Sequence, residues 1–104
     1  MLKGLGDIGN LMKMQKEMKE MQKKLKKASL EGMSSDDSVK ATVNGEYELL
    51  DIKVSQDLIR TGDIKKIEKM ILSAVNDAIV KVKEYSASEM ARLAGGMDLS
   101  NFFK

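Results

Sequence analysis

The feature that most constrains this chain is a heptad repeat of apolar residues over residues 10–28. The spacing is 3-4-3-4-3, and the positions are Leu11, Met14, Met18, Met21, Leu25 and Ala28. Such a narrow seam predicts a helix that packs against another helix, as in a coiled coil. Three heptads are too few for a helix that is stable alone in water, so the seam must be covered. We predict a homodimer whose interface contains Leu11, Met14, Met18, Met21 and Leu25.

The face of this helix opposite the seam is basic. Residues 1–30 carry eight lysines and three acids, a net charge of +5, whereas residues 31–104 have a net charge of −3. Lys24 alone flanks the seam, and the other lysines of the helix lie away from it: Lys13, Lys16, Lys19, Lys23, Lys26 and Lys27. A cationic face with few acidic partners predicts contact with a polyanion. Because lysine is a flexible point charge, it suits phosphates better than base edges.

After this helix the apolar pattern changes to a period of two, which predicts an antiparallel sheet over residues 29–55. The run Val39–Val43 alternates apolar and polar residues, and Asn44-Gly45 after it predicts a hairpin. The apolar phase then slips at Leu49-Leu50, which predicts a β-bulge. Residues 28–34 are a candidate third strand at the edge, so we expect two or three strands.

A second helix is predicted over residues 63–94, because Thr61-Gly62-Asp63 can cap its start and Gly95-Gly96 can stop it. Leu72 and Ile79 widen an apolar face formed by Ile64, Ile67, Ile71, Val75, Ala78, Val82, Met90 and Leu93. At ~1.5 Å per residue this helix would extend about 48 Å, so it outreaches the sheet. Residues 1–9 are expected to be a flexible Gly-rich leader, and residues 97–104 a mobile tail. The whole chain is one α+β domain.

Composition argues against several functions. The chain has no cysteine and no histidine, which removes thiol and imidazole catalysts and the usual zinc ligands. We predict no metal, no cofactor and no enzyme activity. Gly4–Gly9 matches the dinucleotide pattern G-x-G-x-x-G, but no strand can precede it as that site requires. The start lacks the apolar run of a signal peptide and no stretch could span a bilayer, so a cytoplasmic location is expected.

Four segments carry a resemblance to a known family. They are the Met/Gln/Lys-rich Met12–Leu25, the hairpin Val39–Gly45, the helical Ala74–Ala78 and the closing Gly95–Met97. In this order and spacing they resemble the YbaB/EbfC family of nucleoid-associated DNA-binding proteins. One departure is Val54-Ser55-Gln56, which occurs where the family commonly has an Ile-Asp-Pro turn.

The resemblance implies a tweezer-like homodimer, with helices projecting from a β-sheet core, that binds double-stranded DNA in the nucleoid and acts in chromosome organisation or gene regulation. Carried over to this chain, it implies DNA contact by Lys13, Lys16, Lys19, Lys23, Lys26 and Lys27, and on the second helix by Lys81, Lys83 and Arg92. Two alternatives stay open. The Met-rich seam could serve a coiled-coil adaptor that binds a protein partner, or the basic amphipathic helix could bind a membrane surface. The seam lacks Trp and Phe anchors, which argues against the membrane.

Overall fold

The structure, a computed structural model, describes the backbone of residues 2–93 and the side chains of residues 9–93. Its elements follow in the order α1 (Leu2–Lys27), β1 (Ser29–Met33), β2 (Val39–Asn44), β3 (Leu49–Val54), α2 (Gln56–Arg60) and α3 (Ile64–Leu93). The strands form one antiparallel sheet in the order β1-β2-β3. The predicted α+β fold is confirmed, with three strands rather than two.

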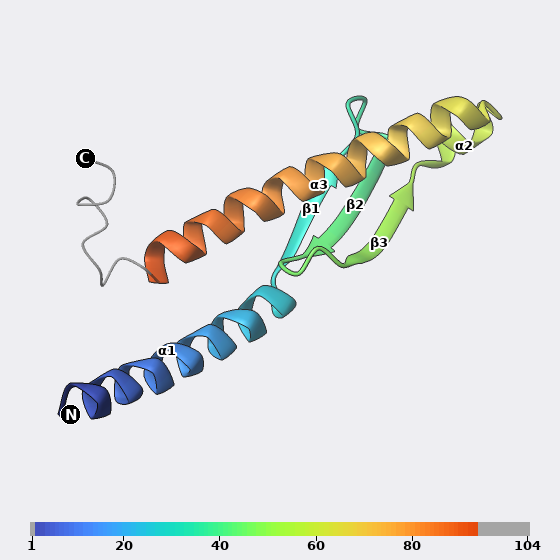
Figure 1. The fold of residues 1–104 in the computed structure, drawn as a ribbon. Coiled ribbons are helices and arrows are strands. Elements are labelled where there is room, and N and C mark those ends of the chain that lie inside the picture. The colour runs from blue at the N-terminus through green and yellow to red at the C-terminus, as the bar shows by residue number, and fades with distance from the viewer. Residues whose placement is uncertain (1, 94–104) are drawn as a thin grey trace, which may run out of the picture.

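Both long helices project beyond the sheet, and they do so on the same side (Figure 1). The N-terminal part of α1 and the C-terminal part of α3 form two arms, while the three strands, α2 and the part of α3 up to Val82 form the body. The extents of the chain are 71 × 30 × 16 Å, which reflects these arms. Two overhanging helices were expected from the length of their apolar patterns.

The helix α1 begins at Leu2, which corrects the leader predicted over residues 1–9. Glycine in a helix costs roughly 0.5–1 kcal/mol relative to alanine. Extending a helix that already exists needs no new nucleation, however, so each added residue gains a hydrogen bond. The glycine-rich segment therefore continues the helix that the heptads begin. The tail predicted over residues 97–104 lies outside the described residues.

The hairpin of β2 and β3 contains the predicted bulge. Val43 pairs with Leu49, whereas Thr42 pairs with Asp51, so Leu50 is the extra residue of β3. The slip in the apolar phase of the sequence is thus a slip in strand register.

Gly45 does not adopt the positive φ that the Asn44-Gly45 pair predicts for the hairpin turn. The hairpin loop spans residues 45–48, and its positive φ of 64° falls at Tyr47 rather than at Gly45. The Gly45 N–H instead donates to the carbonyl of Leu25 at 2.7 Å. A Cβ at this position would lie 2.5 Å from that carbonyl oxygen. Gly45 therefore lets the end of α1 rest directly on the hairpin.

The core lies between α3 and the strands β1 and β2. It contains Val39, Ala41, Val43, Leu58, Met70, Ala74, Ala78 and Val82. The residues of α3 that face the sheet are therefore every fourth one from Met70 to Val82. Ile64, the first residue of the predicted apolar face, is instead 68% exposed. The buried face differs from the predicted one because α3 comes very close to β1: a Cβ on Gly32 would lie 2.2 Å from the backbone nitrogen of Ala78. Helix and strand backbones meet at this glycine.

Two side chains of α3 close the outer edge of β1. Asp77 accepts a hydrogen bond from the Met33 N–H at 2.9 Å, and Lys81 donates to the carbonyl of Glu31 at 2.8 Å. The Met33 N–H, with help from Lys81, holds the pKa of Asp77 below its usual range. Unpaired groups on an edge strand otherwise invite another strand. This edge of the sheet is therefore blocked for strand addition.

The short helix α2 was not predicted. Ser55 begins it as N-cap, because its Oγ accepts the Leu58 N–H at 3.1 Å. Leu58 is 3% exposed and fills the core at the end of the sheet. The departure from the family pattern at Val54-Ser55-Gln56 thus corresponds to a capped turn of helix.

The turn between β1 and β2 is organised by Asp36. Its Oδ1 accepts hydrogen bonds from the Ser34 hydroxyl at 2.8 Å, from the Ser38 N–H at 3.0 Å and from the Ser38 hydroxyl. The hydrogen bonds from Ser38, and then that from Ser34, lower the pKa of Asp36 from 3.8 to about 2.

We expect Asp36→Asn to lower stability at neutral pH, because the charged acceptor makes the stronger hydrogen bonds. The folded-state pKa lies below the ordinary value of 3.8, so the stabilisation by Asp36 is present above pH 4 and is lost as the pH falls toward 2. The urea midpoints of wild type and variant should differ at pH 7 and converge near pH 2. Asp37→Asn is the matched control, since asparagine tolerates its φ of 63°. Equal midpoints at pH 7 for Asp36→Asn and wild type would contradict this account of the turn.

Candidate nucleic-acid interface

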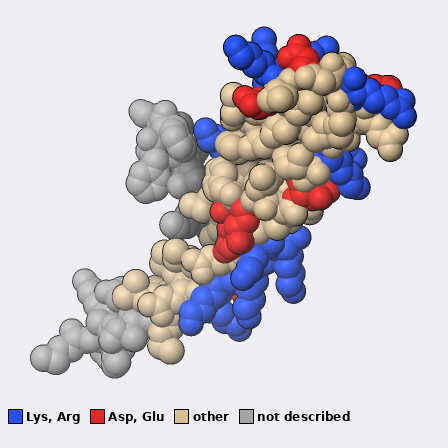
Figure 2. Space-filling model, turned by 90° about the vertical axis from the view of Figure 1, so that its right-hand side faces the viewer, with Lys and Arg blue, Asp and Glu red and all other residues tan. Residues whose placement is uncertain are grey.

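The basic face of α1 is open to solvent along the described part of the helix. Its six lysines are all exposed, and none of them joins the ion pairs found among the described side chains: Lys13, Lys16, Lys19, Lys23, Lys26 and Lys27. Figure 2 shows cationic side chains gathered along one side of this arm. A row of ammonium groups on a projecting rod can follow the phosphates of a long polyanion.

The three basic residues predicted on α3 lie in different settings. Lys81 is engaged at the edge of β1, where it also pairs with Asp77 at 3.3 Å. Lys83 is exposed, one residue after the buried Val82. Arg92 lies on the arm, with a 70% exposed side chain. The structure therefore brings Arg92 beside α1, whereas Lys81 is held against the body.

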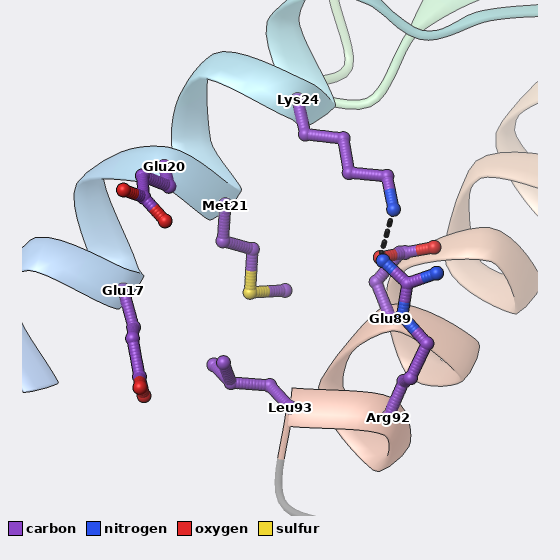
Figure 3. Close-up of a pocket in the computed structure, with 7 residues that line it drawn as sticks. All are labelled: Glu17, Glu20, Met21, Lys24, Glu89, Arg92 and Leu93. Carbon is purple, nitrogen blue, oxygen red and sulfur yellow. Dashed lines mark hydrogen bonds and ion pairs between the residues drawn. The ribbon is translucent and has the colours of Figure 1, made fainter.

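Sequence reasoning missed a contact that joins the two arms. Glu89 of α3 accepts a hydrogen bond from Lys24 of α1 at 2.8 Å and from Arg92 at 3.0 Å (Figure 3). We call these three residues the arm clasp. The hydrogen bond from Lys24 holds the pKa of Glu89 below its usual range, and the charges of Arg92 and Lys24 act in the same direction. The one available signal was that Lys24 alone flanks the seam, a position that forms ion pairs between helices in coiled coils.

The predicted dimer seam is only partly covered. Leu11, Met14 and Met18 are 57%, 50% and 54% exposed. Leu25 is half-buried where α1 meets Gly45, and Met21 is half-buried in a groove between the arms. The chain itself thus covers the base of the seam and leaves its outer part in water.

A second apolar surface lies between α3 and β3. Because α3 packs on β1 and β2, it leaves Leu49 and Leu50 of the third strand 52% and 54% exposed. Ile71 and Val75 of α3 are partly buried against the core, and Leu72 beside Ile71 is 61% exposed. We call this surface the β3 flank, formed by Leu49, Leu50, Ile71, Leu72, Val75 and Ile79. The opposite flank of α3 is polar and bonds to β1 and its turn.

The fold and the basic arm together define a small α+β protein with a cationic projecting helix. The chain belongs to the YbaB/EbfC DNA-binding family, whose model matches residues 3–97. This is a family of nucleoid-associated DNA-binding proteins and not an enzyme family.

Named relatives agree with this assignment. The chain is 36% identical over 69 residues to a nucleoid-associated protein of Finegoldia magna, covering 66% of this chain and 61% of the relative. It is 37% identical over 75 residues to the nucleoid-associated protein TTE0040 of Caldanaerobacter subterraneus, covering 72% of this chain and 68% of the relative. The match thus spans about 60–70% of the length of these relatives.

A solved structure shares the fold. The crystal structure of HP0035 from Helicobacter pylori matches with a TM-score of 0.71 and 26% sequence identity, over 82% of this chain and 89% of that chain. The resemblance expected from the sequence is therefore confirmed at the level of family and fold.

Among residues 2–93, no helix is long and apolar enough to cross a membrane. Among the described side chains, those of residues 9–93, no three acidic groups gather in a way that could hold a metal ion.

Proposed function

We propose that this protein binds double-stranded DNA as a homodimer, mainly through contacts between lysines of α1 and backbone phosphates, and that it acts in chromosome organisation or gene regulation. The observation that carries the proposal is the open basic face of α1, with six exposed lysines that have no ionic partner among the described residues. Family membership supports DNA as the polyanion. Lys83 and Arg92 are secondary candidates, and Lys81 is a weaker one because of its contacts on β1.

The proposed homodimer follows from uncovered apolar surface. Soluble monomers seldom leave a large contiguous apolar patch in water. The β3 flank has three apolar side chains more than half exposed, and the outer seam at Leu11, Met14 and Met18 adds three that are at least half exposed. Since Asp77 and Lys81 block the β1 edge, the β3 side of the sheet is the side on which a second copy fits. Two copies would present two basic arms to one duplex.

Duplex-DNA binding across a salt series tests the function. The logarithm of the association constant should fall linearly with the logarithm of salt, with a slope of about −0.9 per phosphate contact. Vesicles of anionic lipid should compete poorly, because the seam lacks aromatic anchors. No binding to duplex DNA at low salt would overturn the proposal. The exposed methionines and leucine of the seam would then favour the adaptor that binds a protein partner.

A further inference from the structure

In the arm clasp, cationic side chains from two helices contact the same carboxylate oxygen. Lys24 Nζ and Arg92 Nη2 both donate to Oε2 of Glu89, at 2.8 and 3.0 Å. Figure 3 shows the lysine reaching across from α1 and the arginine rising from the end of α3. The Glu89 side chain is 13% exposed, whereas those of Lys24 and Arg92 are 42% and 70% exposed. The carboxylate is thus enclosed by cations that themselves remain open to water.

This contact spans a groove between the arms. The groove has a volume of about 350 Å³, and Met21 of α1 and Leu93 of α3 form its apolar part. Another attachment of α1 is at Leu25, the residue after Lys24, whose carbonyl accepts the N–H of Gly45. The last turn of α1 is thus held by the hairpin and by Glu89 on the arm of α3.

The clasp chemically resembles a protein–phosphate contact. An oxyanion held by an ammonium and a guanidinium is the arrangement in which proteins hold phosphate groups. Ion pairs whose cations remain exposed contribute little to stability and weaken with salt. A duplex, with its dense row of phosphates, can therefore replace one carboxylate at little cost.

We propose that Glu89 is an internal competitor of DNA: a backbone phosphate displaces it from Lys24 and Arg92, so the clasp holds the arms together in the free protein and opens in the DNA complex. This inference rests on the proposed DNA-binding function and adds Lys24 to its contacts. The groove itself is not the phosphate site, since Glu17 and Glu20 line it and would repel an anion. The two cations instead turn outward, as their exposure and long side chains allow.

The test compares Glu89→Gln with Glu84→Gln in the duplex-DNA salt series. Both variants remove one negative charge from α3, and Glu84 is exposed and outside the ion pairs found among the described residues. Beyond the effect of Glu84→Gln, Glu89→Gln should raise affinity about three- to fivefold near 0.1 M salt, because a weak internal contact no longer competes with phosphate. The log–log slopes of the two variants should be equal, because Lys24 and Arg92 contact phosphate in both complexes. Equal affinities of the two variants overturn the inference, and weaker binding by Glu89→Gln would make Glu89 a positioning residue instead.

A distance measurement separates this inference from the function on which it rests. The chain has no cysteine, so spin labels can be placed at Gln15→Cys and Ser88→Cys, both exposed. Labelled chains diluted with unlabelled protein report the separation of α1 and α3 within one chain. Without DNA, Glu89→Gln should lengthen or broaden this distance and Glu84→Gln should not. An unchanged distance in Glu89→Gln refutes the clasp even if wild type binds DNA, whereas wild type that fails to bind refutes the function.

Discussion

Gly32→Ala should strongly destabilise the body of this protein, although it adds only one methyl group. The added methyl carbon would lie 2.2 Å from the nitrogen and 2.7 Å from the Cα of Ala78, and 2.4 Å from the carbonyl oxygen of Ala74. All three atoms belong to the backbone of α3, so no side chain can turn aside. The helix would have to move off β1, which separates Ala74 and Ala78 from the core. Overpacking typically costs about 1–3 kcal/mol, and we expect a loss at or above the upper end.

Gly9→Ala is the matched control for this change. A Cβ at Gly9 meets nothing within 4 Å, and the residue lies inside α1. The same substitution should therefore stabilise the helix by roughly 0.5–1 kcal/mol. Urea unfolding of both variants gives the two values directly. A Gly32→Ala variant as stable as wild type would mean that α3 does not approach β1 as closely as described here.

Leu72→Glu should dissociate the proposed dimer and greatly weaken DNA binding. Leu72 is 61% exposed on the β3 flank, so a charge there costs the single chain little. At the proposed interface, the same charge would be buried without a partner, which is strongly unfavourable. The solution mass should fall to that of one 11.5 kDa chain. Two linked arms can bind 10²–10⁴-fold more tightly than one, and we expect a loss of about 10²-fold.

The control for the interface is Val80→Glu on the same helix. Val80 is 50% exposed but is not part of the β3 flank, so this variant should remain dimeric. Analytical ultracentrifugation measures the mass, and anisotropy of a labelled duplex measures the affinity. A Leu72→Glu variant that keeps the dimer mass would rule out the β3 flank as the interface, whatever its DNA affinity.

Local patterns in the sequence predicted most of the secondary structure. The heptad seam, the alternation of Val39–Val43 and the phase slip at Leu49-Leu50 are each visible within a few residues, and each corresponds to an observed element. Boundaries were harder to predict. Glycines between residues 4 and 9 oppose helix locally, yet the helix of the following heptads extends through them.

Contacts between distant segments could not be predicted from one sequence. Nothing near Gly32 indicates that Ala78 will lie against it, and nothing near Glu89 indicates Lys24. The close approach of α3 to β1 also decides which face of α3 is buried. Gly32 on the strand and Ala78 on the helix let the two backbones meet, so the buried face is the one with small residues and not the one with the most large apolar residues. For the candidate site, the pattern of charges in the sequence identified the exposed lysines of α1. It could not predict that Lys81 donates a hydrogen bond to β1, because that contact depends on how α3 packs on the sheet.

The most direct test of the central claim replaces four lysines of the α1 face with glutamine and repeats the duplex-DNA salt series; the positions are Lys16, Lys19, Lys23 and Lys27. The control makes the same change at four exposed lysines of β3 and α3, which are Lys53, Lys65, Lys66 and Lys69. We predict that the α1 variant stays folded and dimeric, binds at least about a hundredfold more weakly, and loses about 0.9 of slope for each lysine that contacts phosphate. The control should keep nearly the wild-type slope. Equal losses in both variants would mean that net charge, and not the basic face of α1, governs binding.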